Sequence, residues 1–165
     1  MKKRFIGAVV GSLSLATFAL AQPAFMSPEY AKEFCELWNK TPTLTEGLAN
    51  WAKHTREGKE YRSIQFYRTD CGGKEKAIEV HIVNKDGKAI CIYGGKAVDP
   101  KPDFLMYTTT DKWKELANGE FGFMGMGIMT KMTFEGSKVE AMRNMGPFKA
   151  FLLNLGKVPH TDACP

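Results

Sequence analysis

Residues 76–93 read KAIEVHIVNKDGKAICIY, and this stretch decides the fold. Every second residue from Ile78 to Ile82 is apolar, so one face of a strand is apolar and the other is polar. Residues 84–87 follow as Asn-Lys-Asp-Gly, and Asp-Gly is typical of a tight hairpin turn. Residues 89–93 are then predicted to return as a second strand, antiparallel to the first.

Further strands lie on both sides of this hairpin in the sequence. Residues 60–68 alternate in the same way, and the turn at residues 71–73 leads from them into the hairpin. These three strands predict an antiparallel meander. Residues 104–109 are predicted to form a fourth strand, and residues 133–135 are long enough for a short last one.

Helical patterns precede the meander. Ser27 and Pro28 mark a helix start, because a capping hydroxyl is followed by proline at the first helical position. Residues 30–38 continue with one apolar stripe. Residues 43–46, Thr-Leu-Thr-Glu, resemble a capping box. They predict a second short helix that ends near Thr55.

Helical patterns also follow the meander. Residues 110–119 begin with a capping Thr-Asp and end with Asn-Gly, as a short helix does. Ser137 is expected to cap a last helical region, which Gly146-Pro147 disturbs and which then resumes to Leu155. Strands in the middle and helices at both ends predict an α+β fold.

Residues 1–21 have the three zones of a cleavable secretory signal peptide. Residues 2–4 are basic, residues 5–20 are uncharged and mostly apolar, and residues 19–21 (Ala-Leu-Ala) suit a signal peptidase. An uncleaved membrane anchor is the alternative, but a spanning helix needs about 20 apolar residues. We therefore expect residues 22–165 to be one exported domain, periplasmic or secreted, with no transmembrane segment after cleavage.

The charge of the chain changes when this signal is removed. The full sequence has 23 Lys and Arg against 18 Asp and Glu, and losing the three basic residues at positions 2–4 leaves 20 against 18. A nucleic-acid-binding domain usually carries a clustered basic face. The near-neutral balance therefore argues against nucleic acid as a partner.

Four cysteines remain in the mature chain, Cys35, Cys71, Cys91 and Cys164. No two of them form a Cys-x-x-Cys pair, which argues against thioredoxin-type, haem-attachment and common zinc motifs. In an oxidising compartment an even number of cysteines favours disulfides. Three pairings are open, and four buried thiols are the alternative.

The order of the predicted elements in the second half of the chain is typical of a known family. Residues 102–104 (Pro-Asp-Phe) begin a strand, residues 110–113 (Thr-Asp-Lys-Trp) cap a helix, and residues 132–137 form a strand before an amphipathic helix. Over residues 28–157 this order resembles the sterol-binding domain of the sterol carrier protein type 2 family. The chain differs from peroxisomal members of the family in its signal peptide, and it ends without the Ser-Lys-Leu address.

The resemblance implies a five-stranded, mostly antiparallel sheet covered by helices, with an apolar tunnel between sheet and helices. The tunnel would bind a sterol, a fatty acid or another apolar ligand without catalysis and without a cofactor. We expect large apolar side chains of the second half to line it: Phe104, Met106, Trp113, Phe121, Phe123, Met124, Met126, Ile128, Met129, Met132, Phe134, Met142, Met145, Phe148 and Leu152.

Residues 122–132 read GFMGMGIMTKM, with four methionines and three glycines. Methionine adapts to varied apolar partners and glycine lets the backbone bend, so this segment suits the wall of a lipid pocket. It is also compatible with plain core packing. A third interpretation is a Cu(I) site, because thioethers bind Cu(I) in exported proteins.

No catalytic pattern is present in the sequence. His54, His81 and His160 are widely spaced and are expected to be surface residues, and no nucleophile-elbow glycines flank Ser63 or Ser137. The leading hypothesis is therefore an exported carrier of an apolar ligand, not an enzyme. The alternatives are a periplasmic Cu(I)-binding protein that uses the methionine cluster, or an accessory module that docks on an exported enzyme.

Overall fold

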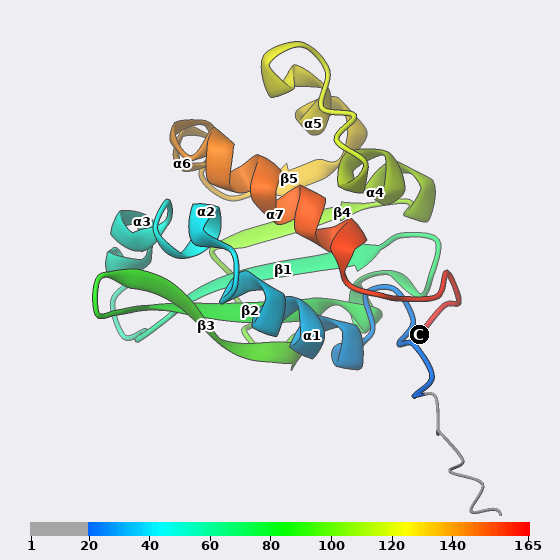
Figure 1. The fold of residues 1–165 in the computed structure, drawn as a ribbon, viewed down its shortest axis with the longest axis horizontal. Helices are drawn as coiled ribbons and strands as arrows, with labels where there is room; N and C mark the ends of the chain where they lie inside the picture. Colours follow the sequence, from blue (N-terminus) through cyan, green and yellow to red (C-terminus); the bar gives the residue numbers. More distant parts are fainter. Residues whose placement is uncertain (1–19) are drawn as a thin grey trace, which may run out of the picture.

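The computed structural model describes residues 20–165 and contains one open, mixed five-stranded sheet (Figure 1). The strand order is β3-β2-β1-β4-β5, and every neighbouring pair is antiparallel except β1 and β4, which are parallel. The predicted α+β fold with a mostly antiparallel sheet is confirmed. The strands are β1 (Arg62–Arg68), β2 (Ile78–Lys85), β3 (Lys88–Lys96), β4 (Phe104–Thr108) and β5 (Thr133–Glu135).

Helices cover the apolar face of this sheet. In Figure 1, α7 crosses in front of the sheet and α1 lies over β2 and β3, while α4 and α5 lie toward the β4–β5 edge. The helices are α1 (Pro28–Trp38), α2 (Pro42–Thr45), α3 (Ala49–Lys53), α4 (Thr110–Ala117), α5 (Met126–Lys131), α6 (Lys138–Arg143) and α7 (Met145–Lys157). Two 3-10 turns, at Gly73–Lys76 and Phe123–Gly125, complete the elements. Among the described residues, no helix has the length and apolarity needed to cross a membrane.

The predicted hairpin is present, with Lys85 paired to Lys88 across a two-residue turn. Its second strand is longer than the predicted residues 89–93, because β3 continues through Gly94 to Lys96. Helix α1 lies directly on this strand, and a Cβ atom at Gly94 would come within 2.8 Å of the Cys35 Cβ. Glycine at this position therefore lets the strand pass under the helix.

The alternation of β2 places Ile78, Val80 and Ile82 in the core with no exposed surface. The opposite face is not open to solvent, however. The loop after β3 packs on Glu79, which is completely buried, and the rings of Tyr61 and Tyr93 flank His81, which is only 8 % exposed. The expectation that His81 is a surface histidine is therefore wrong, because its ring lies between two tyrosine rings on the polar face of an inner strand.

Two helix boundaries differ from the predicted ones. The capping box expected at residues 43–46 does not form, because α2 begins at Pro42, whose ring already has a helical φ angle. The break expected at Gly146-Pro147 lies earlier, at Asn144, which separates α6 from α7. Proline lacks an N–H, and its ring clashes with the carbonyl four residues before it, so a continuous helix ends at Arg143.

The cysteines form two disulfides. Cys35 in α1 is bonded to Cys91 in β3, with 5.4 Å between their Cα atoms. Cys71, in the turn after β1, is bonded to Cys164 in the C-terminal tail. These bonds fix the first helix on the sheet and the end of the chain on the β1–β2 turn. Most of the expected signal peptide, residues 1–19, lies outside the described residues.

Candidate functional site: an apolar pocket between the sheet and two helices

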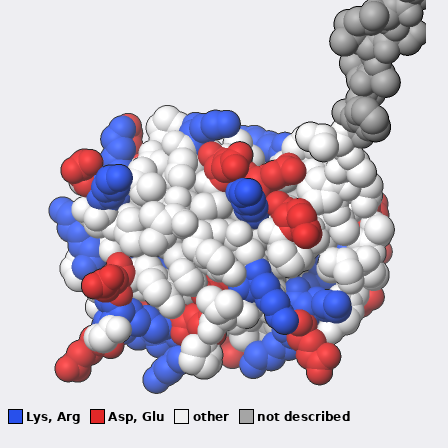
Figure 2. Space-filling view, turned by 90° about the horizontal axis from the view of Figure 1, so that it is seen from below, with Lys and Arg blue, Asp and Glu red and all other residues white. Residues whose placement is uncertain are grey.

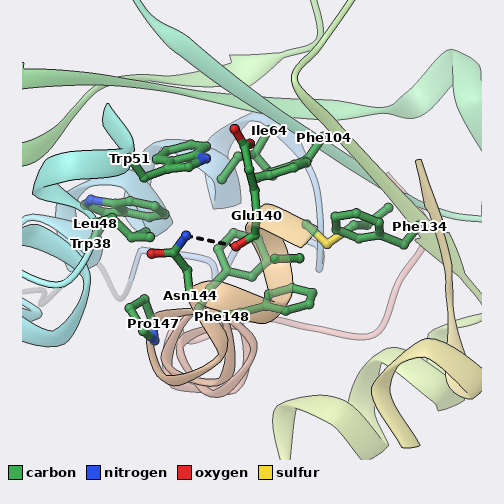
Figure 3. A pocket seen from close by; sticks show the side chains of 13 residues that line it. Trp38, Leu48, Trp51, Ile64, Phe104, Phe134, Glu140, Asn144, Pro147 and Phe148 are labelled. Carbon is green, nitrogen blue, oxygen red and sulfur yellow. Dashed lines mark hydrogen bonds between the residues drawn. The ribbon is translucent and has the colours of Figure 1, made fainter. Parts of the chain in front are cut away.

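A small apolar pocket with a cavity volume of about 40 Å³ lies between the sheet and the helices α6 and α7 (Figure 3). Ligand pockets in proteins occupy about 300–1,000 Å³, so this pocket is nearly closed, and its walls must move apart before a lipid-sized molecule fits. The lining side chains come from seven different elements and the turns between them: Trp38, Leu48, Trp51, Ile64, Phe104, Met106, Phe134, Glu140, Ala141, Asn144, Pro147, Phe148 and Phe151.

The sheet forms one wall of the pocket. Ile64 of β1 is paired with Phe104 of β4, and Met106 of β4 is paired with Phe134 of β5. In a strand every second side chain points to the same face, so these residues point to the helical side together. The Phe104 and Phe134 rings lie 5.2 Å apart, which joins the two strands across this wall.

Two tryptophans of the front helices form the second wall. The Trp38 indole is fully buried and donates a hydrogen bond from Nε1 to the Ala89 carbonyl, at 2.9 Å. The Trp51 ring stacks on Phe104 with 5.7 Å between centroids and 12° between planes. Both rings are held against the sheet, so the pocket has a rigid aromatic side.

The joint between α6 and α7 forms the third wall. Asn144 donates a hydrogen bond from Nδ2 to the Glu140 carbonyl, at 2.8 Å, and so covers the end of α6 (Figure 3). Pro147 follows in the first turn of α7 and lines the pocket. Its ring also touches the turn before α3, where a Cβ atom at Gly47 would lie 2.8 Å from Pro147 Cγ. The helix break thus shapes the pocket.

Arg62 lies beside the pocket, behind Glu140, and is the centre of a polar cluster. This side chain is 5 % exposed, and its guanidinium carbon lies 4.4 Å from the centre of the Trp51 ring. It donates from Nη1 to the His54 carbonyl at 2.9 Å and from Nη2 to Glu140 Oε2 at 2.8 Å. A buried arginine needs such partners, because an unpaired charge away from water is costly.

The carboxylate of Asp103 also lies close to Arg62. Asp103 Oδ1 lies 3.3 Å from Arg62 Nε and 3.1 Å from Arg56 Nε. Its other oxygen accepts a hydrogen bond from the Ser63 backbone N–H at 2.8 Å, which holds it at the start of β1. Arg56, Arg62, Asp103 and Glu140 line a small polar hollow that adjoins the apolar pocket at Glu140.

Four of the side chains expected to contact ligand line this pocket: Phe104, Met106, Phe134 and Phe148. Others lie elsewhere in the core, fully or almost fully buried: Trp113, Ile128, Met132 and Leu152. A third group is partly buried against the core: Phe121, Met129 and Met145. A fourth group is exposed to solvent: Phe123, Met124, Met126 and Met142.

The methionine-rich segment is thus divided between solvent and core. Met124 and Met126 are 76 % and 66 % exposed, whereas Met132 is 6 % exposed and Met129 packs against the core. This division does not favour a shared Cu(I) site of four thioethers. Within residues 20–165, no group of three or more His, Cys, Asp or Glu side chains is arranged to hold a metal ion either.

Several pocket residues were not expected from the sequence: Trp38, Leu48, Trp51, Ile64, Glu140, Ala141, Asn144, Pro147 and Phe151. Trp38 belongs to the apolar stripe of residues 30–38, and Trp51 lies in the second predicted helix. Nothing in the pattern showed that these helices and the last one approach the same part of the sheet. The polar pair Arg62–Glu140 spans 78 positions in the sequence, so no local signal reveals it.

Charged side chains of both signs are interspersed on the face of the molecule shown in Figure 2. Neither Lys and Arg nor Asp and Glu gather into a single patch there. This distribution agrees with the small charge excess of the chain without residues 1–21.

The fold is shared with known proteins of low sequence identity. A crystal structure of sterol carrier protein 2 matches with a TM-score of 0.55 and 13 % identity, over 81 % of this chain and 98 % of that one. A conserved hypothetical protein of Thermus thermophilus, suggested to be a sterol carrier protein, matches with a TM-score of 0.54 and 11 % identity. It is aligned over 99 % of its length and 88 % of this chain. The sequence matches no protein-family model and no curated protein.

Proposed function

We propose that this protein is an exported carrier that holds an apolar small molecule, such as a sterol or an acyl lipid, in the pocket between the sheet and helices α6 and α7. The observation that carries the proposal is the pocket lining, in which aromatic and aliphatic side chains surround a cavity with only Glu140 and Asn144 as polar members. Such a lining favours an apolar occupant, because burial removes its surface from water.

The shared fold supports the same proposal. Sterol carrier protein 2 has this arrangement of sheet and helices at 13 % identity, so the likeness concerns the fold. The joint at Asn144 adds a reason specific to this chain. Because α6 is only six residues long and separate from α7, it provides a short wall that can move when a ligand enters.

Export is the second part of the proposal. Residues 1–21 would direct secretion and be removed, and residues 22–165 would be the working domain. Two disulfides support this placement, because disulfides persist in oxidising compartments. The N-terminal sequence of protein recovered from the periplasm or medium should begin at Gln22. A chain that still begins at Met1 in that fraction would contradict cleavage.

The carrier function is tested on protein purified from its own compartment. Native mass spectrometry and lipid extraction should find a bound apolar molecule, and cis-parinaric acid or dehydroergosterol should bind to delipidated protein. The proposal fails if nothing co-purifies and neither probe binds.

A pair of variants separates the pocket from the rest of the surface. Ala141 is 5 % exposed and lines the pocket, so Ala141→Phe places a ring in the cavity and should abolish probe binding. Met142, its neighbour in α6, is 67 % exposed, so Met142→Phe should leave binding unchanged. Thermal unfolding of both variants shows whether the fold is retained. Equal binding by Ala141→Phe and the parent protein would place the ligand elsewhere.

A further inference from the structure

The apolar pocket has one charged lining residue, Glu140. Its side chain comes from the short helix α6, is 37 % exposed, and extends between Trp51 and Phe104 (Figure 3). An apolar cavity gains nothing from a carboxylate in its wall. The position of Glu140 is instead explained by its hydrogen bond to Arg62 Nη2, since that guanidinium needs an anion.

Arg62 belongs to the sheet and is fixed much more firmly than Glu140. Its Nη1 atom is bonded to the His54 carbonyl, and its planar group lies over the Trp51 and Phe104 rings. The arginine therefore remains in place whatever Glu140 does. Arginine is also suited to carboxylate and phosphate groups, because its N–H groups form a rigid fork.

Three buried donors near Glu140 have no hydrogen-bond partner within the described residues: Trp51 Nε1 in the pocket wall, and Arg56 Nε and Arg62 Nε in the adjoining polar hollow. Trp51 is 6 % exposed and lines the pocket. Arg62 Nε faces Asp103 at 3.3 Å, but without the geometry of a hydrogen bond. Buried polar groups of native proteins are nearly always satisfied, so Trp51 Nε1, which has no carboxylate as a partner, is a donor available to an acceptor that enters the pocket.

The local charges show which group such an acceptor would replace. Arg56 and Arg62 face two carboxylates, Asp103 and Glu140. Asp103 is 3 % exposed and is tied to the Ser63 backbone, whereas Glu140 is partly exposed on a six-residue helix. Glu140 is therefore the anion that can leave while the charge of Arg62 is taken over by another anion.

We infer that the ligand of this pocket is an anionic amphiphile, and that Glu140 occupies its head-group position when the pocket is empty. The apolar body lies among Ile64, Phe104 and Phe148, and the anionic head binds Arg62 and accepts from Trp51 Nε1. Glu140 turns outward as the head enters. This inference rests on the proposed carrier function, and it makes Arg62 and Glu140 the residues that select the charge of the ligand.

A matched pair of probes tests the selection. Dodecanoate and dodecanol carry the same chain length, and at neutral pH only the first has a charged head. Their dissociation constants are measured by calorimetry on delipidated protein below the micelle concentration. In Glu140→Gln the internal competitor is neutral, so affinity for dodecanoate should rise about fivefold, as expected for loss of a partly exposed ion pair. Affinity for dodecanol should change less than about twofold.

Two further variants complete the test. Arg62→Lys keeps a positive charge and removes the fork, so dodecanoate should bind more weakly while dodecanol, which also reports that the pocket is folded, binds as before. Glu36→Gln makes the same charge change on the exposed side of α1 and should alter neither affinity.

The outcomes distinguish the two proposals. If dodecanol binds and Glu140→Gln leaves the ratio of the two affinities unchanged or shifts it toward dodecanol, the head-group inference is wrong and the carrier function stands. If Glu36→Gln raises dodecanoate affinity as much as Glu140→Gln, the effect is long-range charge and the inference is again wrong. If neither probe binds to any variant, the inference fails together with acyl binding in this pocket.

Discussion

The Glu79 carboxylate has no exposed surface, yet both of its oxygens have donors. Oε1 faces His81 Nε2, and Oε2 accepts from Gln65 Nε2 at 2.7 Å and from the backbone N–H groups of Val98 and Asp99, each at 3.0 Å. Burial by itself would raise the pKa of Glu79, but these hydrogen bonds outweigh it and lower the pKa below its ordinary value. The carboxylate therefore holds the loop after β3 on the sheet in its ionised form.

This arrangement predicts how stability changes with pH. An unfolded glutamate has a pKa of about 4.3, and the folded-state pKa of Glu79 is lower. Its contribution to the free energy of unfolding is therefore complete above about pH 4.3 and is lost as the pH falls through the folded-state value. Urea unfolding of Glu79→Gln should show about 1–3 kcal/mol less stability at neutral pH, since one oxygen acceptor becomes a donor.

In acid, the free energy of unfolding of Glu79→Gln should also fall less steeply with decreasing pH than that of the parent protein, because the titrating group is absent. Exposed Glu57 provides the control: Glu57→Gln should keep the parent slope. If Glu79→Gln and Glu57→Gln show the same slope below about pH 4.3, Glu79 does not carry this pH dependence.

At the scale of elements, the joint between α6 and α7 depends on the fit between two turns. Pro147 in the first turn of α7 packs against Gly47 in the turn between α2 and α3. A methyl group at position 47 would lie 2.8 Å from Pro147 Cγ and would press on the Thr43 carbonyl. The backbone at position 47 is held between the Thr43 carbonyl and the Pro147 ring. To make room for the methyl group, α7 would have to shift away from the pocket wall.

Two glycine variants test this fit. Gly47→Ala should lower the free energy of unfolding by about 1–3 kcal/mol, as overpacking usually does. Gly146→Ala adds the same methyl group in the first turn of α7, where a Cβ meets nothing within 4 Å. This substitution should raise the free energy of unfolding by about 0.4–1 kcal/mol. Urea denaturation measures both, and equal effects of the two substitutions would show that the contact with Pro147 is unimportant.

Over the whole molecule, the two ends of the described chain lie together. The Phe25 N–H donates to the Thr161 carbonyl at 2.8 Å, and the Thr161 N–H donates to the Pro23 carbonyl at 2.9 Å. Arg68 of β1 donates from Nη1 to the Phe25 and Ala163 carbonyls, so a sheet residue joins both ends. The bond from Cys71 to Cys164 fixes the tail in this position.

The disulfides should therefore stabilise the domain as a whole. Each closes a long loop, with sequence separations of 56 and 93 between the bonded cysteines. Replacing Cys71 and Cys164 by alanine should lower the free energy of unfolding by about 2–4 kcal/mol, and the Cys35 and Cys91 pair should give a loss of similar size. Urea unfolding with and without reductant measures this. A parent protein whose unfolding midpoint is the same after full reduction would contradict the prediction.

The sequence by itself determined the strands, most helix starts and the class of the fold, because alternation, capping residues and turn residues are local signals. It also marked Phe104, Met106, Phe134 and Phe148, which the structure places in the pocket. Local patterns separate buried from exposed side chains but do not distinguish a core contact from a cavity wall. Trp113 and Leu152 therefore looked the same as Phe148, although they pack in the core.

Only the tertiary structure decided where the pocket lies and what closes its polar end. Arg62 and Glu140 meet because β1 and α6 approach each other in space, and Trp51 joins them from a third element. The burial of Glu79 has the same origin, since the loop after β3 covers it, and so has that of His81, which lies between Tyr61 and Tyr93. Pairings between distant segments depend on the packing of the whole chain, and no short stretch of residues carries that information.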